Sequence, residues 1–328
     1  MSLKRSKIIS TGRALPEKVL TNFDLEKIVD TNDEWIVKRT GIKSRHIADE
    51  NTATSDLAIE ASKKAMEKAG ITAEEIDLIM VATVTPDMIF PSTACIVQEA
   101  LGAVNAAAFD LETACSGFLY GLTIADQFIK TGMYKKILVI GAETLSKVLD
   151  WEDRKTCILF GDGAGAAIVG VSDDESEILS THLGADGSGA DFLAIPAGGS
   201  RMPATADTVA KRLHYITMDG SEVFKFAVRK MSSASLLALE LAGLDVEDVD
   251  FLVPHQANIR IINSAAKKLK LPIDKVHVNL DRLGNISAGS IPIALDEAIE
   301  EGKINKGDVV VLVGFGGGLT WGSCVIRL

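Results

Sequence analysis

The sequence of 328 residues is poor in cysteine, proline and aromatic residues. Its four cysteines, at positions 95, 115, 157 and 324, are too far apart for a CxxC zinc or dithiol motif. Such wide spacing predicts free thiols in a reducing compartment, so we expect a cytoplasmic protein without a bound metal. Because aromatic residues make up only 5%, the core has to be built from Ala, Val, Ile and Leu.

Long apolar runs and an excess of positive charge are also missing. No stretch reaches the roughly 18 apolar residues of a membrane-spanning helix, and the N-terminus lacks the apolar core of a signal peptide. The formal net charge of -11 disfavours a nucleic-acid partner, because such proteins need a basic surface. We therefore expect one large fused α/β unit or two domains, with no membrane contact.

What the chain does contain is an alternation of strand-like apolar runs and helical patterns. Such alternation is typical of βαβ units and predicts an α/β fold with mostly parallel sheets. The expected strands are residues 76–83, 106–111, 137–141, 164–171, 249–254, 276–279 and 309–314. The expected helices are residues 55–69, 117–130, 257–269 and 291–301.

An internal repeat has an offset of 173 residues. The segment 70–79 (GITAEEIDLI) matches 243–252 (GLDVEDVDFL), and the strand end at Gly141 matches Gly314. The repeat predicts two similar halves, residues 1–172 and 173–328. At the same offset Cys115 corresponds to Ala288, so the symmetry should bring the segments around these residues together in a site shared between the halves.

Cys115 is the first candidate for chemistry. It lies between an expected strand and a helix that is apolar on nearly all sides, so its thiol would sit at the positive end of a buried helix. This position is expected to lower the pKa of the thiol and create a nucleophile. The alternative is a small buried hydrophobic residue, which is what we expect for Cys95, Cys157 and Cys324.

Two polar residues could complete such a site. His255 follows an expected strand, and open α/β sheets hold ligands beyond the carboxyl ends of their strands. Asn285 lies in a glycine- and serine-rich helix entry, where its amide could donate to an oxyanion or simply cap the helix. The other histidines are expected to be structural: His46, His182, His214 and His277.

Glycine and charge add two further signals. The glycine clusters at 161–165 and 314–318 lack GxGxxG spacing and are predicted to be turns with close backbone approach, not a dinucleotide site. No acidic residue occurs from 251 to 273, whereas four basic residues do: Arg260, Lys267, Lys268 and Lys270. This excess predicts either a solvated helix face or a docking surface for an acidic partner.

Several motifs together resemble one family, the β-ketoacyl-[acyl-carrier-protein] synthase III enzymes that initiate type II fatty-acid synthesis. The motifs are DTNDEWIVKRTGI (30–42), TACSG (113–117), FGDGAG (160–165), PHQAN (254–258), GNISA (284–288) and GFGGG (314–318). The resemblance covers essentially the whole chain. It implies a thiolase-like, duplicated αβαβα layered fold and a homodimer.

The resemblance also implies catalytic roles. Cys115 would take an acyl group from acyl-CoA as a thioester, with its oxyanion held by the backbone N–H groups of Cys115 and Gly317. His255 and Asn285 would bind the carbonyl of malonyl-acyl-carrier protein and stabilise the enolate left by loss of CO₂. That carbanion would attack the acyl-Cys to give a 3-oxoacyl-acyl-carrier protein, and donors that are fixed in place are most effective where such charge develops.

Binding residues follow from the same resemblance. Acyl-CoA is expected as a substrate, with no permanently bound cofactor. Its nucleotide end would be held by Thr31, Trp35, Arg39 and Arg154. The carrier protein would dock on Gln256, Arg260, Lys267 and Lys268. Phe90 would reach across the dimer and close the partner's primer pocket, which favours a short primer such as acetyl-CoA.

Other readings remain open. Elongating synthases of this superfamily use two histidines with the cysteine, thiolases use a second cysteine, and plant-type polyketide synthases are longer. The nearest alternative is an acyltransferase of the same fold that does not decarboxylate. From another class, the chain could be a catalytically silent scaffold that binds carrier protein, although the intact Cys115, His255 and Asn285 argue against it.

Overall fold

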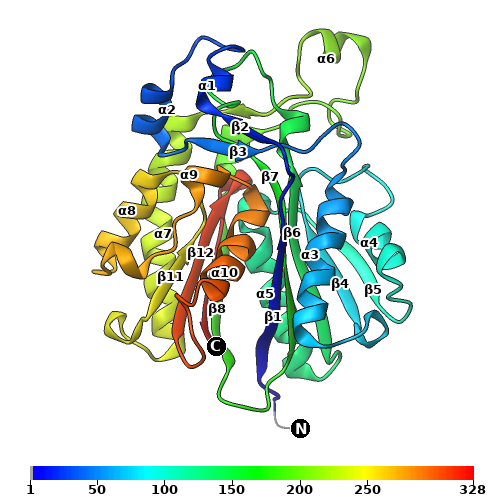
Figure 1. Ribbon diagram of the computed structural model, residues 1–328, viewed down its shortest axis with the longest axis vertical. Coiled ribbons are helices and arrows are strands. Elements are labelled where there is room, and N and C mark those ends of the chain that lie inside the picture. The colour runs from blue at the N-terminus through cyan, green and yellow to red at the C-terminus, as the bar shows by residue number, and fades with distance from the viewer. Residues whose placement is uncertain (1–2) are drawn as a thin grey trace.

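The computed structural model describes residues 3–328 and contains two large β-sheets that lie side by side (Figure 1). The first sheet has the strand order β1-β7-β6-β4-β5. Its strands are β1 (Ser6–Ala14), β4 (Leu78–Ala82), β5 (Ala107–Leu111), β6 (Lys136–Thr144) and β7 (Asp162–Val171). The second sheet has the order β11-β12-β13-β8. Its strands are β8 (Glu177–Ala185), β11 (Phe251–Pro254), β12 (Val309–Gly316) and β13 (Thr320–Arg327).

Helices form three layers around these sheets, which gives a five-layer αβαβα stack (Figure 1). α3 (Thr54–Ala69) and α4 (Thr93–Leu101) pack on the outer face of the first sheet. α7 (Gly220–Ala242) and α8 (Ile259–Lys268) pack on the outer face of the second. α5 (Gly117–Thr131) and α10 (Ser290–Glu300) lie between the sheets. The layered α/β fold expected from the sequence is confirmed.

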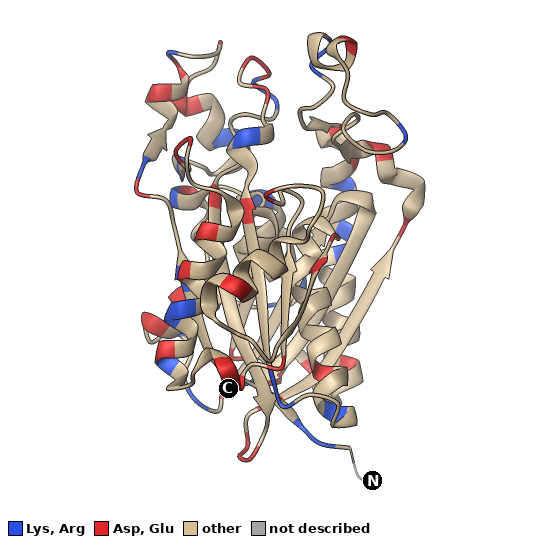
Figure 2. Cartoon of the chain, turned by 90° about the vertical axis from the view of Figure 1, so that its right-hand side faces the viewer, with Lys and Arg blue, Asp and Glu red and all other residues tan. Residues whose placement is uncertain are grey.

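The two central helices are buried because apolar side chains surround them. Every residue from Ser290 to Ala298 of α10 is buried, and α5 contributes Phe118, Leu119 and Leu122 to the same core. A helix that is apolar on all sides belongs in the interior. Charged residues lie mainly on the outer helices and loops, whereas the strands contain few of them (Figure 2).

The same series of elements recurs along the chain at the offset of 173 residues. η1 (Ala73–Glu75), β4, η2 (Ala114–Ser116), α5 and β6 reappear as η5 (Val246–Asp248), β11, η7 (Ser287–Gly289), α10 and β12. Even a rare backbone conformation recurs, since Ala114 has a φ of 47° and Ser287 a φ of 45°, in the left-handed region that L-residues seldom adopt. The boundary between residues 172 and 173 stays a prediction.

The expectation of mostly parallel sheets is wrong. β4 pairs in parallel with β5 and β6, and β11 with β12, but β7 runs antiparallel to β1 and β6, and β13 runs antiparallel to β12 and β8. The three-residue turn η8 (Gly317–Leu319) joins β12 to β13, and a parallel crossover needs a dozen or more residues. The expectation that successive strands pair in parallel therefore fails where a short turn, and not a helix, joins them.

The expected strand at residues 276–279 is also wrong. Only one bridge, between Leu252 and Val276, joins this segment to β11. The backbone N–H groups of Asn279 and Leu280 donate to the Gln256 side chain, at 3.1 and 3.3 Å, so they are not free to pair with a strand. The chain then enters the short helix α9 (Leu280–Leu283).

Shorter elements complete the fold, and several of them gather at the end opposite both termini (Figure 1). These are β2 (Val19–Thr21), α1 (Asn22–Leu25), α2 (Asp33–Thr40), β3 (Ser44–His46) and α6 (Ala206–Ala210). The others are η3 (Leu145–Val148), η4 (Gly187–Phe192), β9 (Leu193–Ala194), β10 (Thr217–Met218) and η6 (Ile273–Lys275). The Asn32 side chain starts α2 by accepting from the Trp35 N–H at 2.8 Å, and Gly41 ends it with a φ of 88°.

Candidate active site

Cys115 lies in η2, between the end of β5 and the start of α5. Close backbone contact fixes its position. A Cβ on Gly316 would lie 2.6 Å from the Cys115 amide nitrogen, so the strand β12 can approach η2 only with glycine there. The predicted turn with close backbone approach is thus confirmed at this cluster. The Cys115 side chain is only 5% exposed.

His255 directly follows β11 and is held by the second sheet. Its N–H donates to the Val313 carbonyl at 2.8 Å, and its ring packs edge-on against Phe315 with 5.4 Å between the centroids. Both ring nitrogens are buried and neither has a hydrogen-bond partner. Burial lowers the pKa of His255 to about 3, so the ring is neutral at physiological pH.

Two backbone hydrogen bonds tie Asn285 to the segment 159–161 in the first half of the chain. Its N–H donates to the Leu159 carbonyl, and its own carbonyl accepts from the Gly161 N–H. The side-chain Oδ1 accepts from the Ser287 N–H at 2.8 Å. That bond fixes which way the amide faces, so the Nδ2 group is left to donate elsewhere. Asn285 does not cap α10, whose N-cap residue is Gly289.

Cys115, His255 and Asn285 line one small cavity of about 90 Å³. Its wall is otherwise largely apolar and includes Phe160, Leu193, Val223, Phe224, Ile261 and Phe315. The segments that the repeat relates also meet here, since a Cβ on Gly117 would lie 3.6 Å from that of Ala288. The symmetry-based expectation that these two helix starts come together is confirmed.

The expected lowering of the Cys115 pKa is wrong for this arrangement. Burial raises the pKa of the thiol to about 12; the Ser287 hydroxyl lowers it, and the Glu143 carboxylate raises it further. The physical reason is that Cys115 precedes the first residue of α5 by two positions and is enclosed by the core. The thiol is therefore neutral near pH 7 and has to lose its proton during any attack.

Glu143 is a buried carboxyl beside Cys115 that sequence reasoning missed. It lies near the end of β6 and accepts from the hydroxyls of Thr85 (2.6 Å) and Thr83 (3.1 Å) and from the Val84 N–H. Burial raises its pKa to about 7 against the opposing effect of these bonds. An acidic residue directly after the apolar run 137–142 was the available signal, because buried carboxylates are rare.

A larger cavity of about 1080 Å³ opens at the end that carries α2. Here two guanidinium groups lie close to the Trp35 ring, with Arg39 at 5.1 Å and Arg154 at 5.3 Å from the ring centroid. This cavity and the Cys115 cavity share Leu159, Met218, Gly220, Phe224 and Asn258 as lining residues. The two spaces therefore adjoin, and the smaller one leads inward to the thiol.

Three of the four residues expected at the nucleotide end meet in this larger cavity. Trp35, Arg39 and Arg154 line it, whereas Thr31 does not. Thr31 lies on the loop before α2, and its buried hydroxyl has no hydrogen-bond partner.

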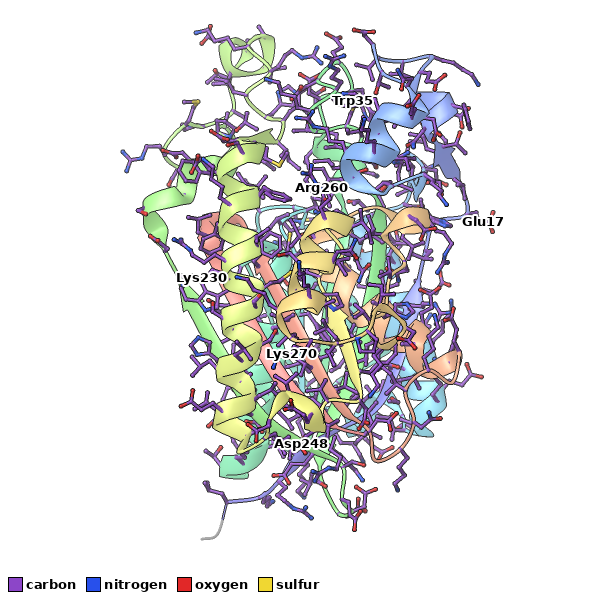
Figure 3. All side chains as sticks on the ribbon, turned by 90° about the vertical axis from the view of Figure 1, so that its left-hand side faces the viewer. Glu17, Trp35, Lys230, Asp248, Arg260 and Lys270 are labelled. Carbon is purple, nitrogen blue, oxygen red and sulfur yellow. The ribbon has the colours of Figure 1, made fainter. Side chains whose placement is uncertain are left out.

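The basic face of α8 begins beside the same cavity. Arg260 lines the cavity and lies over the Phe224 ring at 5.5 Å. Figure 3 shows Arg260 below Trp35, with Lys270 further along. Lys267 and Lys268 are exposed in the last turn of α8. Together the exposed Arg260, Lys267 and Lys268 form what we call the α8 basic face.

Gln256 does not belong to that surface, and its expected contact with a carrier protein is wrong. The residue is 1% exposed. Its side-chain amide donates to the carbonyls of Pro254 (2.8 Å) and His277 (3.0 Å), while its oxygen accepts from two backbone N–H groups. Because these bonds tie the end of β11 to the segment before α9, Gln256 supports the neighbouring His255 from within.

Gly317 and Phe90, the two remaining residues expected at the site, lie in different places. Gly317 is the first residue of η8 and directly follows Gly316, the end of β12 that contacts Cys115. Phe90 is 86% exposed and does not line the cavity of its own chain.

All four cysteines are free thiols, but they differ in exposure. Cys157 and Cys324 are buried as expected, whereas Cys95 is exposed on α4, so its assignment to the interior is wrong. α4 buries only one face against the sheet, and Cys95 lies on the other. In residues 3–328, no cluster of His, Cys, Asp and Glu is placed to hold a metal ion. Over the same range, none of the helices has the length and apolar character needed to cross a bilayer.

The five-layer stack and the buried Cys–His–Asn cluster define a protein of the thiolase-fold class. Family models described as "3-Oxoacyl-[acyl-carrier-protein (ACP)] synthase III" and its "C terminal" part match residues 109–187 and 239–328. Relatives named beta-ketoacyl-[acyl-carrier-protein] synthase III occur in Caldanaerobacter subterraneus subsp. tengcongensis and Clostridioides difficile. They are 63% and 62% identical over 98% of this chain and 97% of theirs.

A solved structure of 3-oxoacyl-[acyl-carrier-protein] synthase III from Aquifex aeolicus VF5 agrees. It is 53% identical and superposes with a TM-score of 0.91 over 98% of this chain and 100% of the other. The chain therefore belongs to the β-ketoacyl-[acyl-carrier-protein] synthase III family.

Proposed function

We propose that this chain condenses a short acyl-CoA primer with malonyl-acyl-carrier protein and releases CO₂ and a 3-oxoacyl-acyl-carrier protein. In the first half-reaction Cys115 takes the acyl group, which makes the enzyme an acyltransferase. The backbone N–H groups of Cys115 and Gly317 hold the oxyanion of that step. In the second half-reaction the acyl-Cys is attacked by the carbanion formed from the malonyl group.

The single observation that carries this proposal is the neutral, unpartnered His255 ring in one cavity with Cys115 and Asn285. Loss of CO₂ from a malonyl thioester leaves negative charge on the thioester oxygen. A neutral imidazole N–H and an amide Nδ2 are both donors, and neither has a protein acceptor among residues 3–328. Fixed donors in a water-poor cavity stabilise such developing charge strongly.

Substrate binding follows the two adjoining cavities. Trp35 with Arg39 and Arg154 offers a flat, cationic platform for a nucleotide, and Thr31 lies on the loop that leads into α2. The α8 basic face, Arg260, Lys267 and Lys268, would attract an acidic carrier protein to the cavity mouth, because opposite charges steer association. No further cofactor or metal is needed for these steps. We place the reaction in the cytoplasm.

The protein would act as a homodimer. Phe90 belongs to an exposed apolar segment with Met88 and Ile89, and large apolar patches are rare on free monomer surfaces. In the dimer Phe90 would close the primer pocket of the partner chain and restrict it to short acyl groups.

The test measures the two half-reactions separately. His255→Ala and Asn285→Ala should still gain radiolabel on Cys115 from acyl-CoA but should release CO₂ from malonyl-carrier protein about 10²–10³-fold more slowly. His182→Ala, at a half-buried histidine that accepts from the Trp321 indole, is the matched control. If wild type acylates Cys115 but releases no CO₂, the non-decarboxylating acyltransferase is the correct function. If Cys115 is never labelled, the chain is a catalytically silent scaffold that binds carrier protein.

A further inference from the structure

The buried central helix α10 carries a carboxylate that none of the steps proposed above uses. This residue, Glu297, is 7% exposed, and carboxylates are seldom buried unless they are paired. Three side chains from the segment 277–282 bind it. Arg282 and Asn279 donate to its two oxygens at 2.7 Å each, and His277 Nε2 lies 3.1 Å from the oxygen that Asn279 binds. Because an ionised carboxylate only accepts, Nε2 carries the proton of His277.

These bonds fasten the segment 277–282 to α10. Burial by itself raises the pKa of Glu297, but the hydrogen bonds from His277, Arg282 and Asn279 hold it well below its usual range, so the carboxylate is charged at neutral pH. Hydrogen bonds to a charged acceptor are stronger than those between neutral groups. His277 and Asn279 are each 1% exposed, so little water competes for these bonds.

The fastened segment in turn holds the chain on both sides of His255. The Gln256 amide donates to the Pro254 carbonyl at 2.8 Å and to the His277 carbonyl at 3.0 Å. Its oxygen accepts from the Asn279 N–H at 3.1 Å. Pro254 and Gln256 are the chain neighbours of His255, so a movement of residues 277–279 would carry the His255 ring with it.

Asn285 is tied to the same carboxylate along the chain. Arg282, which Glu297 binds, lies in α9 shortly before Asn285. Gly284 between them has a φ of 68°, and a Cβ there would lie 2.9 Å from the Leu159 carbonyl oxygen, so the path allows only glycine. Beyond Asn285 the chain passes through η7 into α10, the helix that contains Glu297. Elements that meet at Glu297 therefore hold Asn285 from both directions.

We propose that Glu297 is a positioning residue for decarboxylation, which sets the spacing of the His255 ring and the Asn285 amide by holding the segment between them. This inference deepens the proposed function and rests on it for the identity of the oxygen that both donors meet. Two donors stabilise one developing charge only when both point at it, and a displacement of about 1 Å can cost 10²-fold in rate. Glu297 does not line the Cys115 cavity, so it acts through Gln256 and Arg282.

The position of Cys115 depends on other contacts. It lies in η2, where the close approach of Gly316 fixes its backbone. The second N–H proposed for the acyl oxyanion, that of Gly317, belongs to η8. The hydrogen bonds of Glu297 described above include neither turn. Removal of the Glu297 charge should therefore impair decarboxylation and spare acyl transfer.

Asp296, the chain neighbour of Glu297, offers a matched control. It is 1% exposed and also accepts from three side chains, those of Thr11, Arg13 and Lys68. These donors come from β1 and α3 and not from the segment 277–282. The two carboxylates therefore share a helix, a degree of burial and a number of donors, but they hold different parts of the molecule.

The test compares Glu297→Gln with Asp296→Asn, because each substitution removes one buried charge and keeps the size of the side chain. Acylation of Cys115 by acyl-CoA, CO₂ release from malonyl-carrier protein and the melting temperature are measured in both. Glu297→Gln should lower kcat for CO₂ release by about 10-fold to 10²-fold, while the KM for malonyl-carrier protein and the acylation rate are kept. Asp296→Asn should lower the melting temperature but keep both rates.

A merely structural role predicts a different pattern. It would lower both half-reactions together in Glu297→Gln, or would lower CO₂ release equally in Asp296→Asn. Either result, or an unchanged rate of CO₂ release in Glu297→Gln, would overturn the proposal.

Gln256→Ala interrupts the same path beside His255. It should reproduce the selective loss of CO₂ release. Combined with Glu297→Gln, it should lose less than the product of the two separate losses, because residues on one path are not independent. Fully multiplicative losses would show that Glu297 does not act through Gln256. If Glu297→Gln does not fold, normal CO₂ release in Gln256→Ala alone would overturn the proposal.

Hydrogen–deuterium exchange without substrate separates this inference from the proposed function. The amides of residues 254–258 and 277–285 should exchange faster in Glu297→Gln than in wild type or Asp296→Asn, because local opening becomes easier there. Equal exchange in all three proteins would overturn the positioning role. A wild type that acylates Cys115 but releases no CO₂ would instead remove the proposed function, and the exchange rates would still decide whether Glu297 holds these segments.

Discussion

Burial sets the protonation state of each candidate residue around the cavity. It keeps His255 neutral, keeps the Cys115 thiol protonated, and brings the pKa of Glu143 near 7. These three directions follow from one cause, because a poorly solvated site disfavours the charged form of any group. A neutral imidazole and a protonated thiol therefore share one cavity at physiological pH, and the buried carboxyl of Glu143 lies behind the thiol.

The neutral state of His255 has a measurable cost. Its pKa is lowered from 6.5 to about 3, so the unfolded chain binds this proton more readily. The stability that His255 contributes should therefore be complete above pH 6.5. Below this pH the free energy of unfolding should fall by about 1.4 kcal/mol per pH unit. Urea unfolding at pH 7.5, 6.0 and 5.0 should show this slope reduced in His255→Gln but kept in His46→Gln. Parallel slopes in all three proteins would contradict the buried, neutral assignment.

At the scale of elements, the site depends on how closely β12 approaches η2. Gly316 contacts the Cys115 backbone with no room for a side chain, and the turn η8 then leads directly into β13. The same short turn makes the sheet antiparallel at that edge. One local feature thus determines both the antiparallel pairing of β12 with β13 and the position of Cys115.

Gly316→Ala tests that contact. The added Cβ would lie 2.6 Å from the Cys115 nitrogen, so the backbone has to shift, at a cost of about 1–3 kcal/mol in the free energy of unfolding. Acylation of Cys115 should slow by at least tenfold, because the nucleophile moves with it. Gly187→Ala is the control, since no atom lies within 4 Å of its added Cβ. Equal melting temperatures and acylation rates in both variants would contradict this account.

The sequence predicted the elements that are continuous and apolar. Residues 137–141 lie within β6, and residues 117–130 match α5 closely, because their patterns are set by burial alone. The segment 276–279 failed because its backbone bonds to a side chain, Gln256, that is distant in sequence. Gln256 itself was misplaced on the surface for the same reason, since a glutamine shows no sign of burial in its local sequence.

For the candidate site, the sequence predicted which residues take part but not their protonation states. The motifs supplied Cys115, His255 and Asn285, and the repeat indicated that two segments would meet. The protonation states were not predictable, because they depend on how completely the core encloses each group. Glu143 was missed because β6, which carries it, and η2, which carries Cys115, both pack against η7, and the spacing of residues along the chain does not reveal this.

Across the whole molecule, Met88, Ile89 and Phe90 are three consecutive large apolar residues that a single chain leaves exposed. Val104, nearby in sequence, is also exposed. Burying such side chains gains about 25 cal/mol per Å². A second copy of the chain is the occupant that the proposed function assigns to this surface.

Ile89→Asp should weaken that association. A carboxylate in place of an 86% exposed apolar side chain should be harmless to a monomer but costly in a dimer interface. Light scattering coupled to size exclusion should show a shift from dimer toward monomer at micromolar concentration. Leu241→Asp, at an exposed position on α7, should leave the mass unchanged. A wild-type protein that is already monomeric would contradict the dimer.

Phe90→Thr tests the role of the ring in primer choice. If Phe90 closes the pocket of the partner, removing the ring should extend the accepted acyl chain beyond acetyl. Each additional buried CH₂ is worth about 0.8 kcal/mol, so the preference should shift several-fold per carbon. Competition between acyl-CoAs of different lengths for Cys115 gives the measurement. A wild type that already prefers long primers would refute this role of Phe90.

Under the proposed function, Cys115 transfers the acyl group, while His255 and Asn285 in the same cavity support decarboxylation. The most direct measurement is CO₂ release from malonyl-carrier protein by Cys115→Ser, without acyl-CoA. The variant should gain no acyl label but should still release CO₂, because its two donors are intact. Adding His255→Ala to this variant should lower that release by about 10²-fold or more. A Cys115→Ser protein that releases no CO₂, or a double variant that releases as much, would contradict the claim.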